Sequence, residues 1–205
     1  MRTILASASS TLLVDKSRFI GVTFHVADRE EVITCLKAVR KMHPKAKHYC
    51  YAYIMGSSEK GFDDGEPAKV AGRPLLELLK RGHYDEILLV VVRYFGGIKL
   101  GAPRLLRTYV AVGDDTLAKG AKCEIALMNG YEIDLAYADY ERLQSEAKKH
   151  AFVLENAHFG DSISIRLFSA ERAESTLDEI LQGRGSITSL PVQKRYIEEE
   201  KDEHR

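Results

Sequence analysis

Two groups of charged residues have the types and spacing that could do chemistry. The first is a carboxylate cluster of Asp63, Asp64 and Glu66, which could bind Mg²⁺ or act as an acid and base. The same segment also consists of residues that favour turns. Carboxylates in a chain with many arginines usually form ion pairs. We therefore favour a structural or ion-pairing role for these carboxylates over catalysis, and we expect no metal site.

The second group is cationic and follows an apolar run. Residues 87–92 are all Ile, Leu or Val, which is typical of a strand buried on both faces. Glycines then allow a turn, and Pro103 favours the first turn of a helix. Helix N-termini prefer anions, so cations there predict either pairing with nearby carboxylates or phosphate binding. The members of this group are Arg93, Lys99, Arg104 and Arg107.

Arg93 comes directly after the apolar run, so its stem is expected to start within the core. A guanidinium does not lose its proton in proteins, and a buried one needs a partner. We predict that a carboxylate of the 63–66 loop pairs with Arg93 and orders that loop. Arg104 and Arg107, three residues apart on a helix, would remain free for an anion.

Three tyrosines alternate along the strand predicted at residues 47–55. Tyr49, Tyr51 and Tyr53 share one face of it. This ladder could stack on nucleic-acid bases, or it could pack against a helix, which is the commoner arrangement. His48 and Cys50 share the other face, and without further residues at metal-ligand spacing they indicate a buried polar pair.

The composition is that of an ordinary soluble globular protein, with 45% hydrophobic and 29% charged residues among 205. Lys and Arg equal Asp and Glu in number, but residues 1–128 are basic and residues 129–205 are acidic. This asymmetry is consistent with a first domain that faces an anion. The three cysteines have no paired spacing. Without a signal peptide or an apolar run of membrane-spanning length, we expect a cytoplasmic protein and no membrane partner.

The predicted elements fall into two groups and indicate an α+β fold. The first group has strands at 17–26, 47–55 and 87–92, a helix between Asp28 and Pro44, a long loop at 56–72, and helices starting at Pro74 and Pro103. The second group has strands at 130–136, 151–156, 162–168 and 187–197, with helices at 137–150 and 170–182. The second order is βαββαβ, the ferredoxin-like arrangement. The charge run from Glu198 to Arg205 is predicted to fray.

Four segments, taken in order, carry a resemblance to a known family. They are residues 48–53 (HYCYAY), 63–67 (DDGEP), 71–74 (AGRP) and 92–101 (VRYFGGIKLG). Over residues 17–120 the chain resembles the IMPACT family. The resemblance implies an N-terminal domain, residues 1–128, like the second domain of a small-subunit ribosomal protein. It also implies a ferredoxin-like C-terminal domain, residues 129–205, like the last domain of elongation factor G.

The chain departs from the family pattern in two places. Small residues with glycine and threonine are usual where this chain has Lys69 and Val70, and two glycines are usual where it has Pro103 and Arg104. Replacing the two glycines by Pro103 and Arg104 makes a close approach of the backbone to a ligand less favourable at that turn. Both departures add a cation.

The resemblance implies a role linked to translation, because eukaryotic relatives regulate translation through a starvation-response kinase pathway. For bacterial members, nucleic-acid or ribosome binding is the usual suggestion. We therefore expect binding of RNA or the ribosome by a basic surface of the N-terminal domain. The expected contact residues are Arg73, Arg93, Lys99, Arg104, Arg107, Tyr49, Tyr51 and Tyr53.

Two alternatives remain open. One is an enzyme acting on a phosphorylated or anionic small molecule, and the other is a protein–protein adaptor. The chain has no phosphate-loop or nucleophile-elbow motif. A role without catalysis and without a cofactor is therefore favoured.

Overall fold

The apolar run forms strand β6 (Ile87–Tyr94), which lies at the centre of the first sheet. The computed structural model describes residues 1–198, so the predicted fraying beyond Glu198 lies outside the described residues. The chain divides into two units. The first comprises residues 1–124 with Ile197 and Glu198, and the second comprises residues 125–196. The described residues form two five-stranded sheets and five helices, a mixed architecture consistent with α+β.

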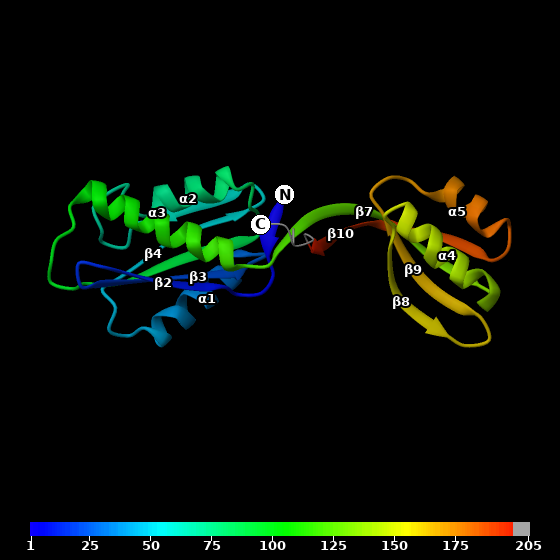
Figure 1. The fold of residues 1–205 in the computed structure, drawn as a ribbon, viewed down its shortest axis with the longest axis horizontal. Coiled ribbons are helices and arrows are strands. Elements are labelled where there is room, and N and C mark those ends of the chain that lie inside the picture. The colour runs from blue at the N-terminus through cyan, green and yellow to red at the C-terminus, as the bar shows by residue number, and fades with distance from the viewer. Residues whose placement is uncertain (199–205) are drawn as a thin grey trace. The chain divides into compact units, whose positions relative to one another are not determined.

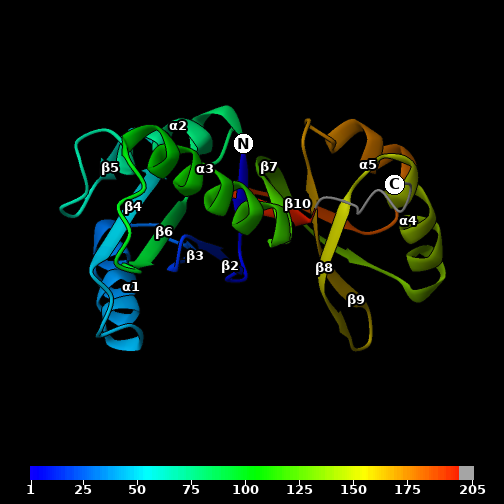
Figure 2. The ribbon, with the colours of Figure 1, turned by 60° about the vertical axis from the view of Figure 1, so that its left-hand side comes forward.

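The first sheet is antiparallel throughout, with the strand order β2-β3-β6-β4-β5. Its other strands are β2 (Ser9–Val14), β3 (Ser17–His25), β4 (His48–Met55) and β5 (Ser58–Phe62). Helices α2 (Gly72–Arg81) and α3 (Ala102–Lys119) cover one face, and α1 (Arg29–Met42) covers the other (Figures 1 and 2). The prediction that β6 is buried on both faces is therefore confirmed.

The two faces of β6 enter two separate cores. Leu89 and Val91 pack with residues of α2 and α3, whereas Leu88, Val90 and Val92 pack with residues of α1. Because side chains alternate along a strand, a strand with helices on both sides needs apolar residues at every position. This requirement explains the uninterrupted run of Ile, Leu and Val in the sequence.

Local chemistry explains where the helices begin and end. Asp28 caps α1 by accepting a hydrogen bond from the Glu31 N–H at 2.9 Å, and the helix stops two residues before Pro44. Helix α3 begins after Gly101, which has a φ of 74°, and it carries Pro103 in its first turn. These predicted boundaries are confirmed.

Part of the predicted loop at residues 56–72 is a strand, and this prediction was wrong for residues 58–62. In the part of the chain that the structure describes, strand β5 pairs only with β4, at the edge of the sheet. An edge strand with a mostly exposed, polar surface lacks the alternation by which strands are recognised. The chain start also forms two strands that were not predicted, β1 (Arg2–Ile4) and β2.

The second unit has the element order strand, helix, strand, strand, helix, strand. Its elements are β7 (Lys122–Leu135), α4 (Tyr137–Lys149), β8 (Val153–Phe159), β9 (Ile163–Ser169), α5 (Glu174–Leu181) and β10 (Ser186–Glu198). Strand β7 pairs with β1 through its first residues and with β9 through its last, while β8 pairs with β9 and β10 with β7. One face of this sheet packs with α4 and α5. Among the helices of residues 1–198, none is long and apolar enough to cross a membrane.

Helix α3 approaches β3 so closely that only glycine fits at position 21. A Cβ placed on Gly21 would overlap the side chain of Thr116, which hydrogen bonds with Ser10 at 2.6 Å. We expect Gly21→Ala to lower the free energy of unfolding by about 1–3 kcal/mol through overpacking, as measured by urea denaturation. Gly160→Ala is the control, because a Cβ there meets only ordinary contacts. Equal stability of the two variants would contradict this account.

Candidate functional site

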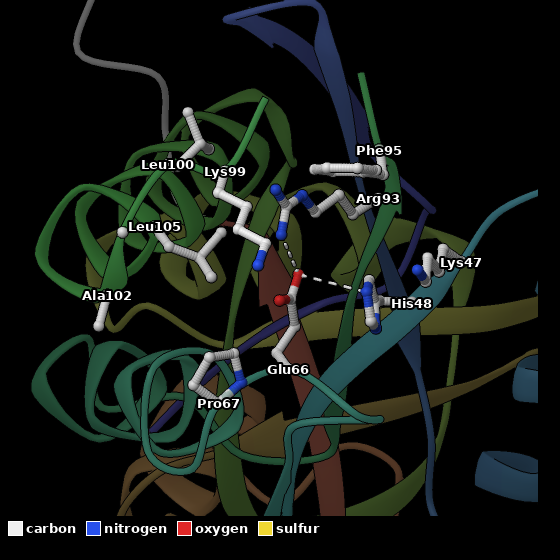
Figure 3. A pocket seen from close by; sticks show the side chains of 11 residues that line it. Lys47, His48, Glu66, Pro67, Arg93, Phe95, Lys99, Leu100, Ala102 and Leu105 are labelled. Carbon is white, nitrogen blue, oxygen red and sulfur yellow. Dashed lines mark hydrogen bonds and ion pairs between the residues drawn. The ribbon is translucent and has the colours of Figure 1, made fainter. Parts of the chain in front are cut away.

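A cavity of about 400 Å³ opens in the first unit beside the end of β6 and the start of α3 (Figure 3). Its charged and polar lining consists of Lys47, His48, Glu66, Arg93 and Lys99. Its apolar walls include Pro67, Phe95, Leu100, Ala102 and Leu105. A pocket with apolar walls and a few convergent polar groups is the usual form of a ligand site.

The sheet register brings the polar residues together. Arg93 lies opposite Phe19 of β3 and opposite His48 of β4. The side chains of Phe19 and His48 therefore flank that of Arg93 on one face of the sheet. The loop after β6 returns to α3 through Gly97 and Gly101, whose φ values of 88° and 74° favour glycine. This loop carries Phe95 and Lys99 to the cavity.

The predicted partner of Arg93 is a carboxylate of the 63–66 loop, and this prediction is confirmed for Glu66. Arg93 Nη1 donates to Glu66 Oε1 at 2.6 Å, and the two side chains are only 5% and 4% exposed. The hydroxyl of Tyr109 donates to the same oxygen at 2.8 Å. Glu66 is thus held from β6 and α3 at once, which fixes the loop against both elements.

The two aspartates of the cluster bind the backbone instead of the cavity. Asp63 accepts from the N–H groups of Lys69, Ala71 and Gly72 at 2.8–3.0 Å, so it satisfies donors at the start of α2. Asp64 accepts from the Tyr49 N–H at 2.8 Å and from Arg40 at 3.1 Å. Within residues 1–198, no group of three or more His, Cys, Asp or Glu residues could hold a metal ion.

The family departures have structural consequences in this loop and in α3. Lys69 has a φ of 66°, a backbone conformation that favours glycine. The Asp63 carboxylate accepts its N–H and stabilises this conformation. Pro103 and Arg104 both lie in the first turn of α3, where Pro103 removes one of the free N–H donors.

His48 enters the cavity in a defined orientation. Its Nδ1 lies 2.9 Å from the carbonyl oxygen of Asp64, so Nδ1 carries a proton and donates it. Its Nε2 lies 4.0 Å from Glu66 Oε1. His48 was assigned from sequence only to a polar pair, and Lys47 and Phe95 were not identified. Phe95 lies within the family segment 92–101 and Lys47 directly precedes the segment 48–53, and this position was the signal available from the sequence.

The predicted cations do not form one group. Lys99 lines the cavity, and Arg73 and Arg107 are exposed without an ionic partner among the described residues. The expectation that Arg104 is free was wrong. Its Nη1 and Nη2 contact both carboxylate oxygens of Asp15 at 2.5 and 3.2 Å, because the β2–β3 turn brings Asp15 to α3.

The tyrosine ladder packs against α1, which is the commoner arrangement, and the alternative of base stacking is wrong for Tyr49 and Tyr53. Tyr49 and Tyr53 are buried in the core that includes α1 residues. Tyr51 is half-buried, and its ring lies 5.3 Å from that of Phe62. Because α1 covers this sheet face, the rings of Tyr49 and Tyr53 are not accessible to a base.

A buried hydrogen-bonded chain lies behind the cavity. Cys50 Sγ is 3.3 Å from the Tyr109 hydroxyl, which in turn donates to Glu66. Burial raises the pKa of the Cys50 thiol to about 12, although its hydrogen bond with Tyr109 acts in the opposite direction. Burial also raises the pKa of Tyr109, as do neighbouring Cys50 and Glu66. Both groups therefore remain neutral and serve to position Glu66.

Chemically, the cavity is suited to anion binding. Lys47, Lys99 and Arg93 supply three positive charges against the single negative charge of Glu66. Helix α3 starts at this wall, and its N-cap Gly101 provides no side-chain cap. The uncapped helix end adds a positive partial charge and free N–H groups.

The buried ion pair predicts the effect of removing Arg93. We expect Arg93→Ala to lower the free energy of unfolding by about 3–5 kcal/mol, because Glu66 would keep a buried, unpaired charge. Arg104→Ala is a matched control. Its pair with Asp15 is 52% and 31% exposed, so the loss should stay below about 1 kcal/mol. Chemical denaturation measures both, and similar midpoints would refute the assignment.

The raised pKa of Cys50 predicts a slow reaction with alkylating reagents. The thiolate is the reactive form, and a thiol with a pKa of about 12 is almost entirely protonated at pH 8. Iodoacetamide should modify half-buried Cys35 before Cys50, as measured by peptide mass spectrometry. Cys50 should react only after unfolding. Rapid native modification of Cys50 would show that the chain behind the cavity opens readily.

Comparisons with known proteins match both units. A family model described as the Impact N-terminal domain matches residues 15–117. A second model, described as a domain of unknown function (DUF1949), matches residues 133–184. A crystal structure described as a hypothetical protein aligns with a TM-score of 0.61 and 27% identity, covering 94% of this chain and 97% of that chain.

Two curated relatives match along most of their length. IMPACT family member YvyE of Bacillus subtilis is 31% identical, over 96% of this chain and 96% of its own. IMPACT family member YigZ of Escherichia coli is 32% identical, over 88% of this chain and 92% of its own. Since the matches include both parts of the chain, the protein belongs to the IMPACT family.

Proposed function

We propose that this protein is a translation-linked regulator that binds RNA, free or in the ribosome, through a basic surface of its first unit. The basic surface is defined here as Lys47, Arg73, Lys99 and Arg107. The observation that carries the proposal is that these exposed cations have no carboxylate partner among the described residues. Cations left unpaired by the protein are available to phosphates.

Membership of the IMPACT family supports the link to translation, as do the regulators of translation among its eukaryotic relatives. We also infer that the first unit resembles the second domain of a small-subunit ribosomal protein. The second unit would be ferredoxin-like and resemble the last domain of elongation factor G. The strand order β8-β9-β7-β10 with two helices on one face supports this inference. A cytoplasmic location fits such a role.

A second candidate function is that of an enzyme acting on a phosphorylated or anionic small molecule. The observation that favours it is the cavity itself, in which Glu66 and Arg93 lie beside His48. Asp63 and Asp64 are engaged by backbone N–H groups, which argues against a catalytic cluster of three carboxylates. A protein–protein adaptor is the remaining alternative, and affinity capture from lysate with and without ribonuclease separates it from RNA binding.

Arg107 and Arg104 provide a matched pair for testing RNA binding, because both lie on α3 and, among residues 1–198, only Arg104 has an ionic partner. We expect the wild-type protein to bind total RNA at low salt and to lose affinity steeply as salt increases. Arg107→Ala should flatten the slope of log K against log salt by about 0.7, the value for one phosphate of a single strand. Arg104→Ala should change it less. Filter binding across a salt series measures all three.

The outcomes of this experiment are distinct. No RNA binding by the wild-type protein at low salt would overturn the proposed function. An equal flattening by both substitutions would instead show that the pair with Asp15 does not withhold Arg104 from RNA. In that case the basic surface would have to include Arg104.

A further inference from the structure

We propose that the cavity is a binding site for a nucleoside monophosphate, in which the phosphate is a monoester and the base is a flat ring. The ligand is either a free nucleotide or the 5′-phosphorylated end of an RNA. If the ligand is an RNA end, this inference rests on the proposed function; if it is a free nucleotide, the inference is independent of it. It assigns a specific ligand to the cavity, in addition to the general electrostatic attraction of the basic surface.

The Arg93 guanidinium has N–H donors that no described residue accepts. A guanidinium has five N–H donors, and the only hydrogen bond that the Arg93 guanidinium makes within the described residues is that from Nη1 to Glu66. Its Nε is buried without a hydrogen-bond partner among the described residues. The guanidinium lies over the rings of Phe19 and Phe95, 5.2 and 5.5 Å from their centroids, and the side chain lines the cavity. Buried donors without acceptors are costly. Nη2 makes no hydrogen bond among the described residues and is not one of the buried unpartnered atoms, so an oxygen-rich anion in the cavity could accept from it.

The charge of the lining matches a phosphate monoester. Lys47, Lys99 and Arg93 carry three positive charges and Glu66 carries one negative charge, which leaves two net positive charges. A phosphate monoester has a charge of about −1.5 to −2 at neutral pH, whereas a diester inside an RNA chain has only one negative charge. The uncapped start of α3 lies at the same wall and also favours a dianion. The cavity therefore prefers a terminal phosphate to an internal one.

The remaining walls suit a flat, weakly polar ring. Phe95 is 40% exposed, and Pro67, Leu100 and Leu105 form other parts of the lining. A sugar phosphate without a base would leave its hydroxyls unpaired against these apolar walls. A nucleobase can instead contact them through its ring.

Glu66 adds one acceptor for the ring edge. The contacts that the described residues make with its carboxylate all involve Oε1, from Arg93, Tyr109 and His48. Oε2 is therefore available for an N–H donor of a base. Figure 3 shows this carboxylate between Arg93 and His48 at the cavity. A volume of about 400 Å³ lies within the range of small-ligand pockets.

The test uses adenosine 5′-monophosphate, with adenosine and ribose 5-phosphate as partial ligands, in isothermal titration calorimetry on the full chain. We expect the whole nucleotide to bind at least about tenfold more tightly than either part, since each part loses one set of contacts. Lys99→Ala should weaken nucleotide binding about tenfold. Phe95→Ala should weaken binding of the nucleotide but not of ribose 5-phosphate.

The control variant is Lys119→Ala, which removes a cation paired with Asp115 at the other end of the same helix. It should leave nucleotide binding unchanged. A short RNA with a 5′-phosphate, compared with the same RNA with a 5′-hydroxyl, distinguishes the two sources. A preference for the phosphorylated end identifies RNA ends as ligands, whereas equal binding of the two RNAs together with nucleotide binding identifies the free nucleotide.

The proposal is overturned if the nucleotide does not bind at millimolar concentration and the two RNAs bind equally. It is also overturned if Lys99→Ala and Phe95→Ala both bind the nucleotide as the wild type does, because the site must then lie elsewhere. Neither result affects the salt-dependent binding of total RNA. Conversely, nucleotide binding without any binding of total RNA would refute the proposed function and leave the cavity assignment standing.

Discussion

Arg93 leaves a strand that is buried on both faces, so its positive charge must find partners inside the protein. The strand needs apolar residues on both sides, and the guanidinium does not lose its proton. Glu66 neutralises it at 2.6 Å. The position of the 63–72 segment follows from this pair, because Glu66 also accepts a hydrogen bond from Tyr109 of α3. A change at either partner would therefore affect the loop, the sheet and the helix together.

The same pair creates the conditions for a ligand site. Glu66 uses only one of the five donors of Arg93, and the loop that carries Lys99 keeps further positive charge at the cavity. Asp63 and Asp64 stabilise the loop that carries Glu66 and do not line the cavity, since both bind backbone N–H groups. The protein thus separates two uses of carboxylates that lie within four residues of one another. The aspartates shape the loop, and the glutamate faces the cavity.

Sequence patterns were most informative where a local rule has one physical outcome. The apolar run of β6, the cap at Asp28 and the helix stop before Pro44 depend on neighbouring residues alone, and each was predicted correctly. The need of Arg93 for a carboxylate was also predictable, because a buried guanidinium without a partner of opposite charge is strongly destabilising. Strand β5 was missed because an exposed edge strand is specified by its pairing with β4 and has no alternating pattern of its own.

The amino-acid sequence by itself determined the family, the central strand and the pairing of Arg93 with the loop. Only the tertiary structure decided which charges remain available. Arg104 is held by Asp15, 89 residues away in sequence, and the accessibility of the tyrosines depends on where α1 packs. His48 reaches the cavity through the register of β4 with β6, and Lys47 follows because its N–H donates to the Arg93 carbonyl. These outcomes depend on distances between residues remote in the chain, which local composition and spacing do not encode.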